Sequence, residues 1–181
     1  MKKIKILSLL FCVVMLVAAC HDDEEGPIIP QPREQVGRTV LVYIVGDNGV
    51  NELSDLFKTN FEDMKEGMKE VDYSKCNLVV YSEMVNDVPR LVSLKKQNGK
   101  VVADTLFTYS EQNPLAKEVM SSVISQTVSY FPADSYGFVF LSHSSSWVPA
   151  TNDANSRSIG YYRRTQMNIP DFHDVLLSSF P

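Results

Sequence analysis

The chain contains two nearly continuous apolar runs, and apolar positions at helical spacing lie between them. Residues 39–45 and 77–81 are rich in β-branched side chains, as expected for strands buried on both faces of a parallel sheet. Between residue 51 and about residue 71, acidic residues separate a helical-period set: Leu53, Leu56, Phe57, Asn60, Met64 and Met68. This order predicts a β-α-β unit with right-handed parallel pairing.

The second half of the chain repeats the alternation of strands and helices. Residues 91–94 and 101–107 flank Asn98-Gly99, which is the strongest short signal for a β-hairpin. Asn113-Pro114 predicts the start of a helix that continues to Tyr130, because Asn caps helices and Pro favours their first turn. A buried strand is expected from Tyr136 to Leu141, after a turn at residues 132–135.

The C-terminal part predicts three short segments. Residues 151–158 are polar, residues 159–162 form a short apolar piece, and a last helix is expected near Pro170. The whole pattern indicates an α/β fold with a mainly parallel sheet. The chain ends where another central strand is due, so we expect the sheet to be incomplete at its C-terminus.

The N-terminus, residues 1–19, has the pattern of a secretory signal peptide. Lys2, Lys3 and Lys5 precede an apolar run at residues 6–17, and small residues follow. Leu16 to Cys20 resembles the lipobox of bacterial lipoproteins, which implies that the Cys20 sulfur is acylated and anchors the protein to a membrane. The alternative is an ordinary signal peptide with an incidental cysteine.

Residues 20–37 are predicted to form an acidic and proline-rich tether that holds the domain away from the membrane. The cluster at residues 21–25 resembles the export signal with which Bacteroidetes-type bacteria carry lipoproteins to the outside of the outer membrane. We therefore expect an outer-membrane lipoprotein at the cell surface, with the periplasmic face as the alternative. Charged tethers are also often only solvated spacers.

The composition of the chain excludes some classes of partner and ligand. The chain is 44% hydrophobic and 22% charged, which is ordinary for one globular domain. Removal of residues 1–19 leaves 14 basic against 22 acidic residues, so nucleic acid is not an expected partner. Cys76 is then the one unmodified thiol, and the scattered histidines, His21, His143 and His173, do not predict a metal site.

The strongest candidate for chemistry is His143, in a small polar loop directly after the apolar strand. The carboxyl ends of strands in open α/β sheets are where loops and helix N-termini converge on ligands. An imidazole there can act as a general base or acid. The alternative is a non-catalytic loop histidine whose hydrogen bonds are satisfied by its neighbours.

Several of these segments resemble the clostripain family of cysteine peptidases. That family has an Asp-Asn pair after the first strand, a strand ending in Ser-His-Gly-x-Gly-Trp, and a later strand ending in Asp-x-Cys. Asp47 and Asn48 match the first element, and Ser142, His143 and Trp147 match the second. The third element, which carries the nucleophile, has no counterpart in the chain.

The resemblance implies that residues 38–181 form part of a caspase-like three-layer sandwich. It implies peptide hydrolysis after basic residues by a Cys-His dyad, in which the imidazole lowers the thiol pKa and protonates the leaving amine. His143 takes that role, and peptides or proteins are the implied substrates. Ser144 and Ser146 stand where the family has glycine, which restricts the backbone near the oxyanion. Without the cysteine, we expect no activity from this chain by itself.

The sequence allows more than one role for several other residues. Asp47 either caps the first helix or, with Asn48, contacts substrate. Arg157 is either a processing site, as the family implies for this region, or an exposed loop arginine. Cys76 precedes a strand at the edge opposite the predicted site, which favours a structural role.

The resemblance also makes a calcium requirement conceivable, but no feature of the sequence supports a calcium site. We therefore expect no cofactor.

Two further functions remain as alternatives. The serines beside His143 could indicate a serine hydrolase, but the G-x-S-x-G elbow is missing and serine-rich loops are usually turns. The chain could also be a non-catalytic surface lipoprotein that acts as a binding or scaffold module. A downstream strand ending in Asp-x-Cys would distinguish a peptidase from such a module.

Overall fold

The computed structural model describes residues 30–49, 51–144 and 158–181 of the protein. The elements in chain order are β1 (Arg38–Val45), α2 (Asn51–Gly67), the 3-10 helix η1 (Met68–Glu70), β2 (Cys76–Glu83), β3 (Arg90–Gln97), β4 (Lys100–Thr108), α3 (Lys117–Tyr130), β5 (Tyr136–Ser142), β6 (Ser158–Tyr162), β7 (Thr165–Asn168) and α4 (Ile169–Ser179). The predicted leader, residues 1–19, lies outside the described residues.

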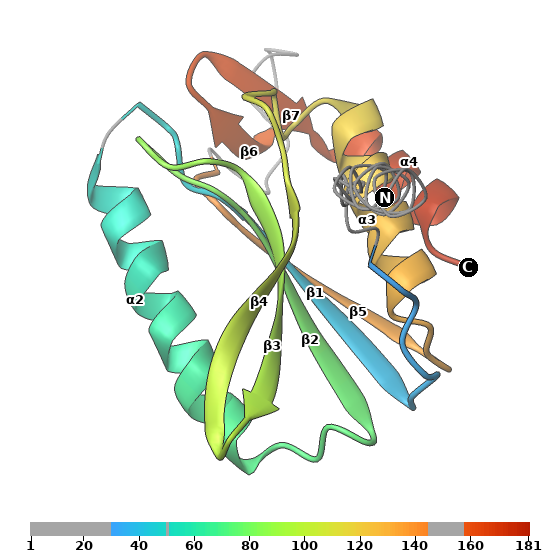
Figure 1. The fold of residues 1–181 in the computed structure, drawn as a ribbon. Coiled ribbons are helices and arrows are strands. Elements are labelled where there is room, and N and C mark those ends of the chain that lie inside the picture. Colours follow the sequence, from blue (N-terminus) through green and yellow to red (C-terminus); the bar gives the residue numbers. More distant parts are fainter. Residues whose placement is uncertain (1–29, 50, 145–157) are drawn as a thin grey trace, which may run out of the picture.

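The domain has three layers, with one sheet between two layers of helices (Figure 1). The five-stranded sheet has the order β4-β3-β2-β1-β5. Strand β1 pairs in parallel with β2 and β5, whereas β3 is antiparallel to both β2 and β4, so β3 alone among these strands runs against the others. Helix α2 covers one face of the sheet, and α3 and α4 cover the other. The predicted α/β fold with a mainly parallel sheet is confirmed.

Strand β1 lies at the centre of the core, as its uninterrupted apolar pattern predicts. Leu41, Tyr43 and Val45 face the cluster under α3 and α4, and Val42 and Ile44 face the cluster under α2. The residues from Leu41 to Val45 are at most 4% exposed. The strand is therefore buried on both faces, because helices pack on both sides of the sheet.

Helix α2 differs from its prediction at one position. Leu56, expected on the buried face, is 53% exposed. Phe57 is buried, and Phe61 and Met64 pack against the same cluster instead. Positions 57, 61, 64 and 68 follow the helical repeat, whereas position 56 lies about 100° away from this stripe.

The structure confirms one of the predicted turns and corrects the predicted start of a helix. Asn98 and Gly99, with φ values of 52° and 79°, connect β3 to β4, which confirms the predicted hairpin. The next helix begins at Lys117 rather than at Asn113. The Asn113 side chain instead accepts from the Leu115 N–H at 3.0 Å and closes a turn. The predicted start of that helix was therefore wrong by about one turn.

The C-terminal part contains a hairpin of β6 and β7, followed by α4. The apolar piece at residues 159–162 is confirmed as β6, but β7 was not predicted because its four residues are mostly polar. Helix α4 begins where expected: the Asn168 side chain caps it by accepting from the Asp171 N–H at 2.7 Å, and Pro170 stands in its first turn.

The residues that precede β1 already contact the domain. The Arg33 N–H donates to the Tyr130 carbonyl at 2.9 Å, and Val36 forms an isolated parallel bridge with Ala133. The Arg33 guanidinium also lies 4.8 Å from the centre of the Phe131 ring. The last residues of the predicted tether therefore lie against the end of α3.

Candidate functional site

The carboxyl ends of the parallel strands bring the sequence-predicted site residues to one edge of the sheet. Val45 at the end of β1 pairs with Glu83 of β2 on one side and with Ser142 of β5 on the other. Asp47 and Asn48 follow β1, and His143 follows β5. The structure thus places these residues at the ends of neighbouring strands, beneath the β6–β7 hairpin (Figure 1).

His143 is exposed and lies against a residue of β6. Its ring centre is 5.3 Å from that of Tyr161, and the two planes are tilted by 59°. The preceding residue ties the two segments together: the Ser142 hydroxyl accepts from the Tyr161 N–H at 3.2 Å and is 3.4 Å from the Tyr161 carbonyl, to which it donates. The backbone of β6 is therefore attached to the end of β5 at the residue before the histidine.

Asp47 is bound by the turn of the β6–β7 hairpin. Arg163 donates from Nε to Asp47 Oδ2 at 2.7 Å and from its backbone N–H to the Asp47 carbonyl at 2.9 Å. We call these two contacts the Asp47–Arg163 clamp. The other carboxylate oxygen of Asp47 accepts from the Gly49 N–H at 3.2 Å. Asp47 is only 6% exposed, so its charge is held in a partly desolvated position.

Arg163 was missed by the sequence analysis. It adopts a left-handed conformation, with φ of 52°, at the hairpin turn, and its guanidinium also pairs with Glu111. Hydrogen bonds to Asp47 and Glu111 raise the pKa of Arg163 further above its ordinary value. Its one local signal was its place beside Arg164 between two short strand segments, which does not identify a partner.

Glu83 is a second residue that sequence reasoning missed. It ends a buried strand, is 3% exposed, and its Oε2 has no hydrogen-bond partner among the described residues. Burial, followed by repulsion from Asp47, raises the pKa of Glu83 from 4.5 to about 7. The available signal was a glutamate two positions after the apolar run at residues 78–81, where a charge is costly if the strand continues into the core.

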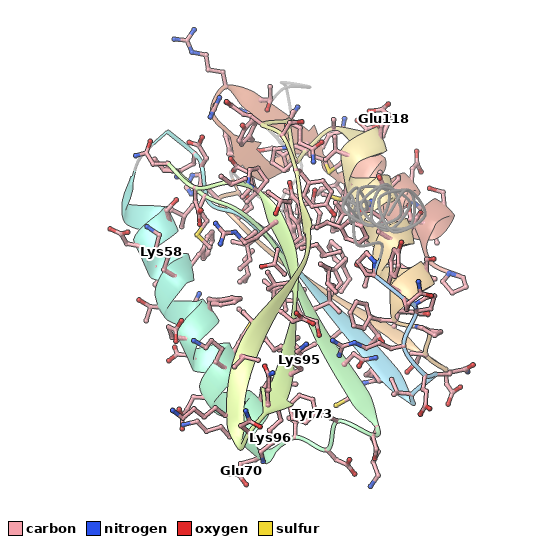
Figure 2. All side chains as sticks on the ribbon, viewed as in Figure 1. Lys58, Glu70, Tyr73, Lys95, Lys96 and Glu118 are labelled. Carbon is pink, nitrogen blue, oxygen red and sulfur yellow. The ribbon has the colours of Figure 1, made fainter. Side chains whose placement is uncertain are left out.

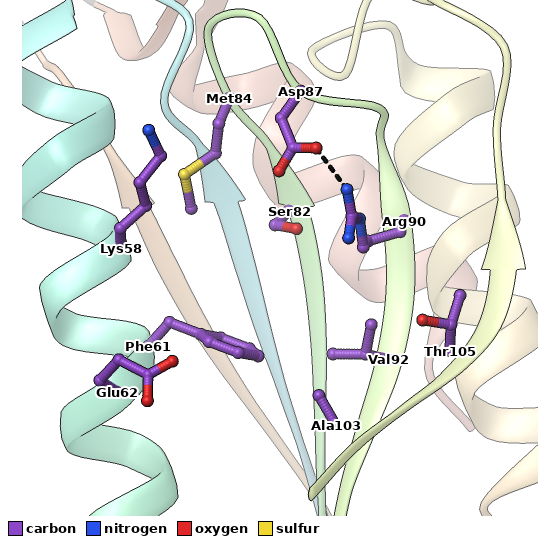
Figure 3. A pocket seen from close by; sticks show the side chains of 10 residues that line it. All are labelled: Lys58, Phe61, Glu62, Ser82, Met84, Asp87, Arg90, Val92, Ala103 and Thr105. Carbon is purple, nitrogen blue, oxygen red and sulfur yellow. Dashed lines mark hydrogen bonds and ion pairs between the residues drawn. The ribbon is translucent and has the colours of Figure 1, made fainter.

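A cavity of about 350 Å³ opens beside the histidine loop. Its walls are mostly aromatic and aliphatic, with two serines that flank His143: Phe138, Phe140, Ser142, Ser144, Ile159, Phe172 and Leu176. A second cavity, of about 320 Å³, lies between α2 and strands β2 to β4 (Figure 3). The sequence predicted a site at the strand ends, and the first cavity extends from that edge along β5 towards α4.

Cys76 lies far from this edge. It is the first residue of β2, paired with Arg38 at the start of β1. Figure 2 shows the nearby Tyr73 at the end of the molecule opposite the β6–β7 hairpin. The structure therefore does not bring Cys76 and His143 together, and Cys76 is the free cysteine among the described residues.

Some predicted site residues cannot be placed. Cys20, Trp147 and Arg157 lie outside the described residues. Within the described ranges, no three His, Cys, Asp or Glu side chains are grouped as metal ligands. No helix in this part of the chain is long and apolar enough to cross a membrane.

Comparisons with known proteins agree on one family. The model of the clostripain family, Peptidase C11, matches residues 42–180. A secreted C11 cysteine protease from Bacteroides thetaiotaomicron, solved with an irreversible peptide inhibitor, is 40% identical with a TM-score of 0.67, over 81% of this chain and 40% of that chain. A search of curated proteins found no match.

Two other solved structures cover less of this chain. A "B. fragilis cysteine protease" is 41% identical with a TM-score of 0.57, over 66% of this chain and 98% of that chain. An inactive zymogen C11 protease from Parabacteroides distasonis is 34% identical with a TM-score of 0.58, over 65% of this chain and 34% of that chain. The chain thus spans about 40% of the length of the secreted Bacteroides thetaiotaomicron protease and about a third of the zymogen.

Proposed function

The chain belongs to the clostripain family of cysteine peptidases, and we propose that it supplies the histidine-bearing part of a peptidase that hydrolyses peptide bonds after basic residues. His143 is the general acid and base of the proposed Cys-His dyad, and the nucleophile comes from a strand beyond β5. Asp47 and Asn48 line the approach to the same edge.

The observation that carries the proposal is the position of His143. It follows β5, at the carboxyl edge of a parallel sheet, where a neighbouring strand end can deliver a thiol within reach of the imidazole. Strand β5 has a described neighbour, β1, on one side only. This arrangement supports pairing of the nucleophile-bearing strand along the other side of β5.

The test is hydrolysis of an arginyl amide by the longest product of the coding sequence. We expect activity to require a downstream Asp-x-Cys and to fall by at least about 10³-fold in His143→Ala, because the thiol then loses the base that deprotonates it and the leaving amine loses its acid. His173→Ala is the matched control, since His173 is an exposed histidine on α4. Undiminished hydrolysis by His143→Ala would overturn the dyad.

Arg157 is proposed as a processing site in such a product. The polar composition of residues 151–158 supports this proposal. The length of the "B. fragilis cysteine protease" chain also supports it, since 98% of that chain matches within 66% of this one. Arg157→Ala should block conversion to two chains while Arg164→Ala leaves it unchanged. If both variants are cleaved like the wild type, Arg157 is an ordinary loop residue.

A non-catalytic binding or scaffold lipoprotein is the second candidate. It is favoured by the position of Cys76 at the start of β2, whereas His143 follows the carboxyl end of β5. Absence of any downstream cysteine, together with retained binding of a peptide by the protein, would support this role and exclude hydrolysis by a dyad.

We also propose that Cys20 is lipidated. The sequence pattern before it supports this, and metabolic labelling with a fatty-acid analogue should mark the wild type but not Cys20→Ala. Cys12→Ala, which changes the other leader cysteine, should label normally. Equal labelling of the Cys20→Ala protein would exclude the anchor.

The acidic residues 22–25 are proposed to direct the lipoprotein to the cell surface. Their replacement by alanine should protect the protein from protease added to intact cells, because the protein then stays on the periplasmic side. If accessibility is unchanged, the acidic run serves only as a spacer.

A further inference from the structure

The β6–β7 hairpin is attached to both strands that carry the candidate site residues. On the β5 side, the Ser142 hydroxyl bonds to the backbone N–H and carbonyl of Tyr161. On the β1 side, the turn of the hairpin is held by the Asp47–Arg163 clamp. The hairpin therefore cannot shift relative to one strand end without breaking polar contacts with the other.

Tyr161 forms the first of these attachments, and Arg163, two positions later, forms the second. It is half-buried, its backbone bonds to Ser142, and its ring lies 5.3 Å from the ring of His143. Its neighbours Gly160 and Tyr162 are both buried, so β6 is anchored on each side of it. Such anchoring fixes the backbone from which the Tyr161 ring projects.

Gly160 shows how closely β6 approaches the rest of the domain. A Cβ at this position would lie 2.9 Å from Leu115 Cδ2 and 2.9 Å from Phe140 Cζ. Only glycine permits this approach without displacing its neighbours. The path of β6 beside β5 is thus set by packing as well as by hydrogen bonds.

We propose that Tyr161 is a positioning residue for His143, and that the Asp47–Arg163 clamp holds Tyr161 in place. An exposed imidazole on a loop samples several rotamers, and an aromatic ring packed against it favours one of them. The inference rests on the proposed function only where it concerns catalysis. The position of the imidazole is a property of this chain alone.

The experiment is NMR of the full chain at fixed pH, with the ring Hε1 resonances of the histidines assigned by His→Gln variants. The Tyr161 ring current displaces the His143 resonance, so Tyr161→Leu should move it towards the position of the exposed His173. Tyr161→Phe keeps the ring and should leave the His143 resonance in place. Unchanged methyl resonances of the buried residues Val42 and Ile44 show that each variant is folded.

The clamp is tested by a matched pair of neighbouring arginines. Arg163→Gln should move the His143 resonance in the same direction as Tyr161→Leu, because the turn of the hairpin is released. Arg164→Gln should leave it unchanged. The proposal is overturned if Tyr161→Leu does not move the His143 resonance, if Tyr161→Phe moves it as much, or if the two arginine variants behave alike.

Hydrolysis gives a separate readout. In a form of the protein that cleaves an amide, Tyr161→Leu should lower kcat on the order of 10-fold to 100-fold with KM nearly unchanged, because a misplaced imidazole affects the reacting geometry. An unchanged His143 resonance in Tyr161→Leu would refute the positioning of His143. Absence of hydrolysis in every form, with the His143 resonance moved as expected, would instead refute the proposed peptidase function.

Discussion

Strands β1 and β5 are neighbours with similar apolar sequences, yet they differ in burial. Leu41 to Val45 of β1 are at most 4% exposed, whereas no residue of β5 is fully buried and Val139 is 43% exposed. The paired residues Val42 and Val139 show the difference directly, since they are identical and lie opposite each other. The contrast therefore comes from position in the sheet and not from residue type.

Among the described elements, β1 is enclosed, whereas β5 is open along one side. Strand β1 has a strand on each side and helices on both faces, whereas β5 has one described strand neighbour. Asp47 at the end of β1 is buried and clamped, and His143 at the end of β5 is exposed. The candidate site thus joins a fixed acidic part to an accessible imidazole.

The largest predicted effect concerns the buried side of this comparison, at Glu83. Its pKa is raised from 4.5 to about 7, so the folded state holds a proton that the unfolded state loses between these pH values. The wild type should lose on the order of 3 kcal/mol of unfolding free energy relative to Glu83→Gln as pH rises from 4.5 to 7. Urea unfolding of both proteins across this range measures it.

The titratable groups that interact with Glu83 are Tyr43, Asp47, Tyr81, Glu111, Tyr162 and Arg163. They are unchanged in Glu83→Gln, so the difference between the two proteins isolates the titration of Glu83. A difference in unfolding free energy that does not vary with pH would show that this carboxyl is not strained by burial.

A valine-to-alanine substitution at each of the two paired positions, Val42 and Val139, tests the difference in burial. Val42→Ala should cost about 2 kcal/mol, because it removes two buried methyl groups and leaves a cavity. Val139→Ala should cost less than about 1 kcal/mol, because its side chain is 43% exposed. Equal losses in chemical unfolding would mean that β5 is covered as fully as β1.

A smaller effect is expected where β6 approaches β5. Gly160→Ala should cost about 1–2 kcal/mol, because the new methyl group meets Leu115 and Phe140 at 2.9 Å. Gly67→Ala is the control, since a Cβ there meets nothing within 4 Å. Thermal unfolding compares the two, and a neutral Gly160→Ala would show that the hairpin can move away from β5.

The smallest change in stability is expected for Val139→Lys, below about 1 kcal/mol, because the side chain can extend into solvent. Its main effect should be on association: an unpaired apolar edge favours pairing between chains, and an edge lysine opposes it. Light scattering at increasing concentration measures this. A wild type that stays monomeric with a cooperative thermal transition would contradict an open edge at β5.

Local sequence signals determined much of the fold. The apolar runs of β1, β2 and β5, the Asn98-Gly99 turn and the Asn168 cap each act over a few residues, so their pattern is visible without the structure. The motif around His143 also identified the family, because strand and loop are contiguous there. The start of α3 was misjudged because Asn113 closes a turn instead of a helix.

Contacts between residues far apart in the sequence arise from tertiary packing, so they could not be predicted from local patterns. Asp47 and Arg163 are 116 positions apart, and their contact depends on how the β6–β7 hairpin folds over the strand ends. The raised pKa of Glu83 and the exposure of Leu56 and Val139 likewise depend on what packs around them. Sequence determines the periodicity and chemistry of each segment, but burial and electrostatic environment arise when separate segments pack together.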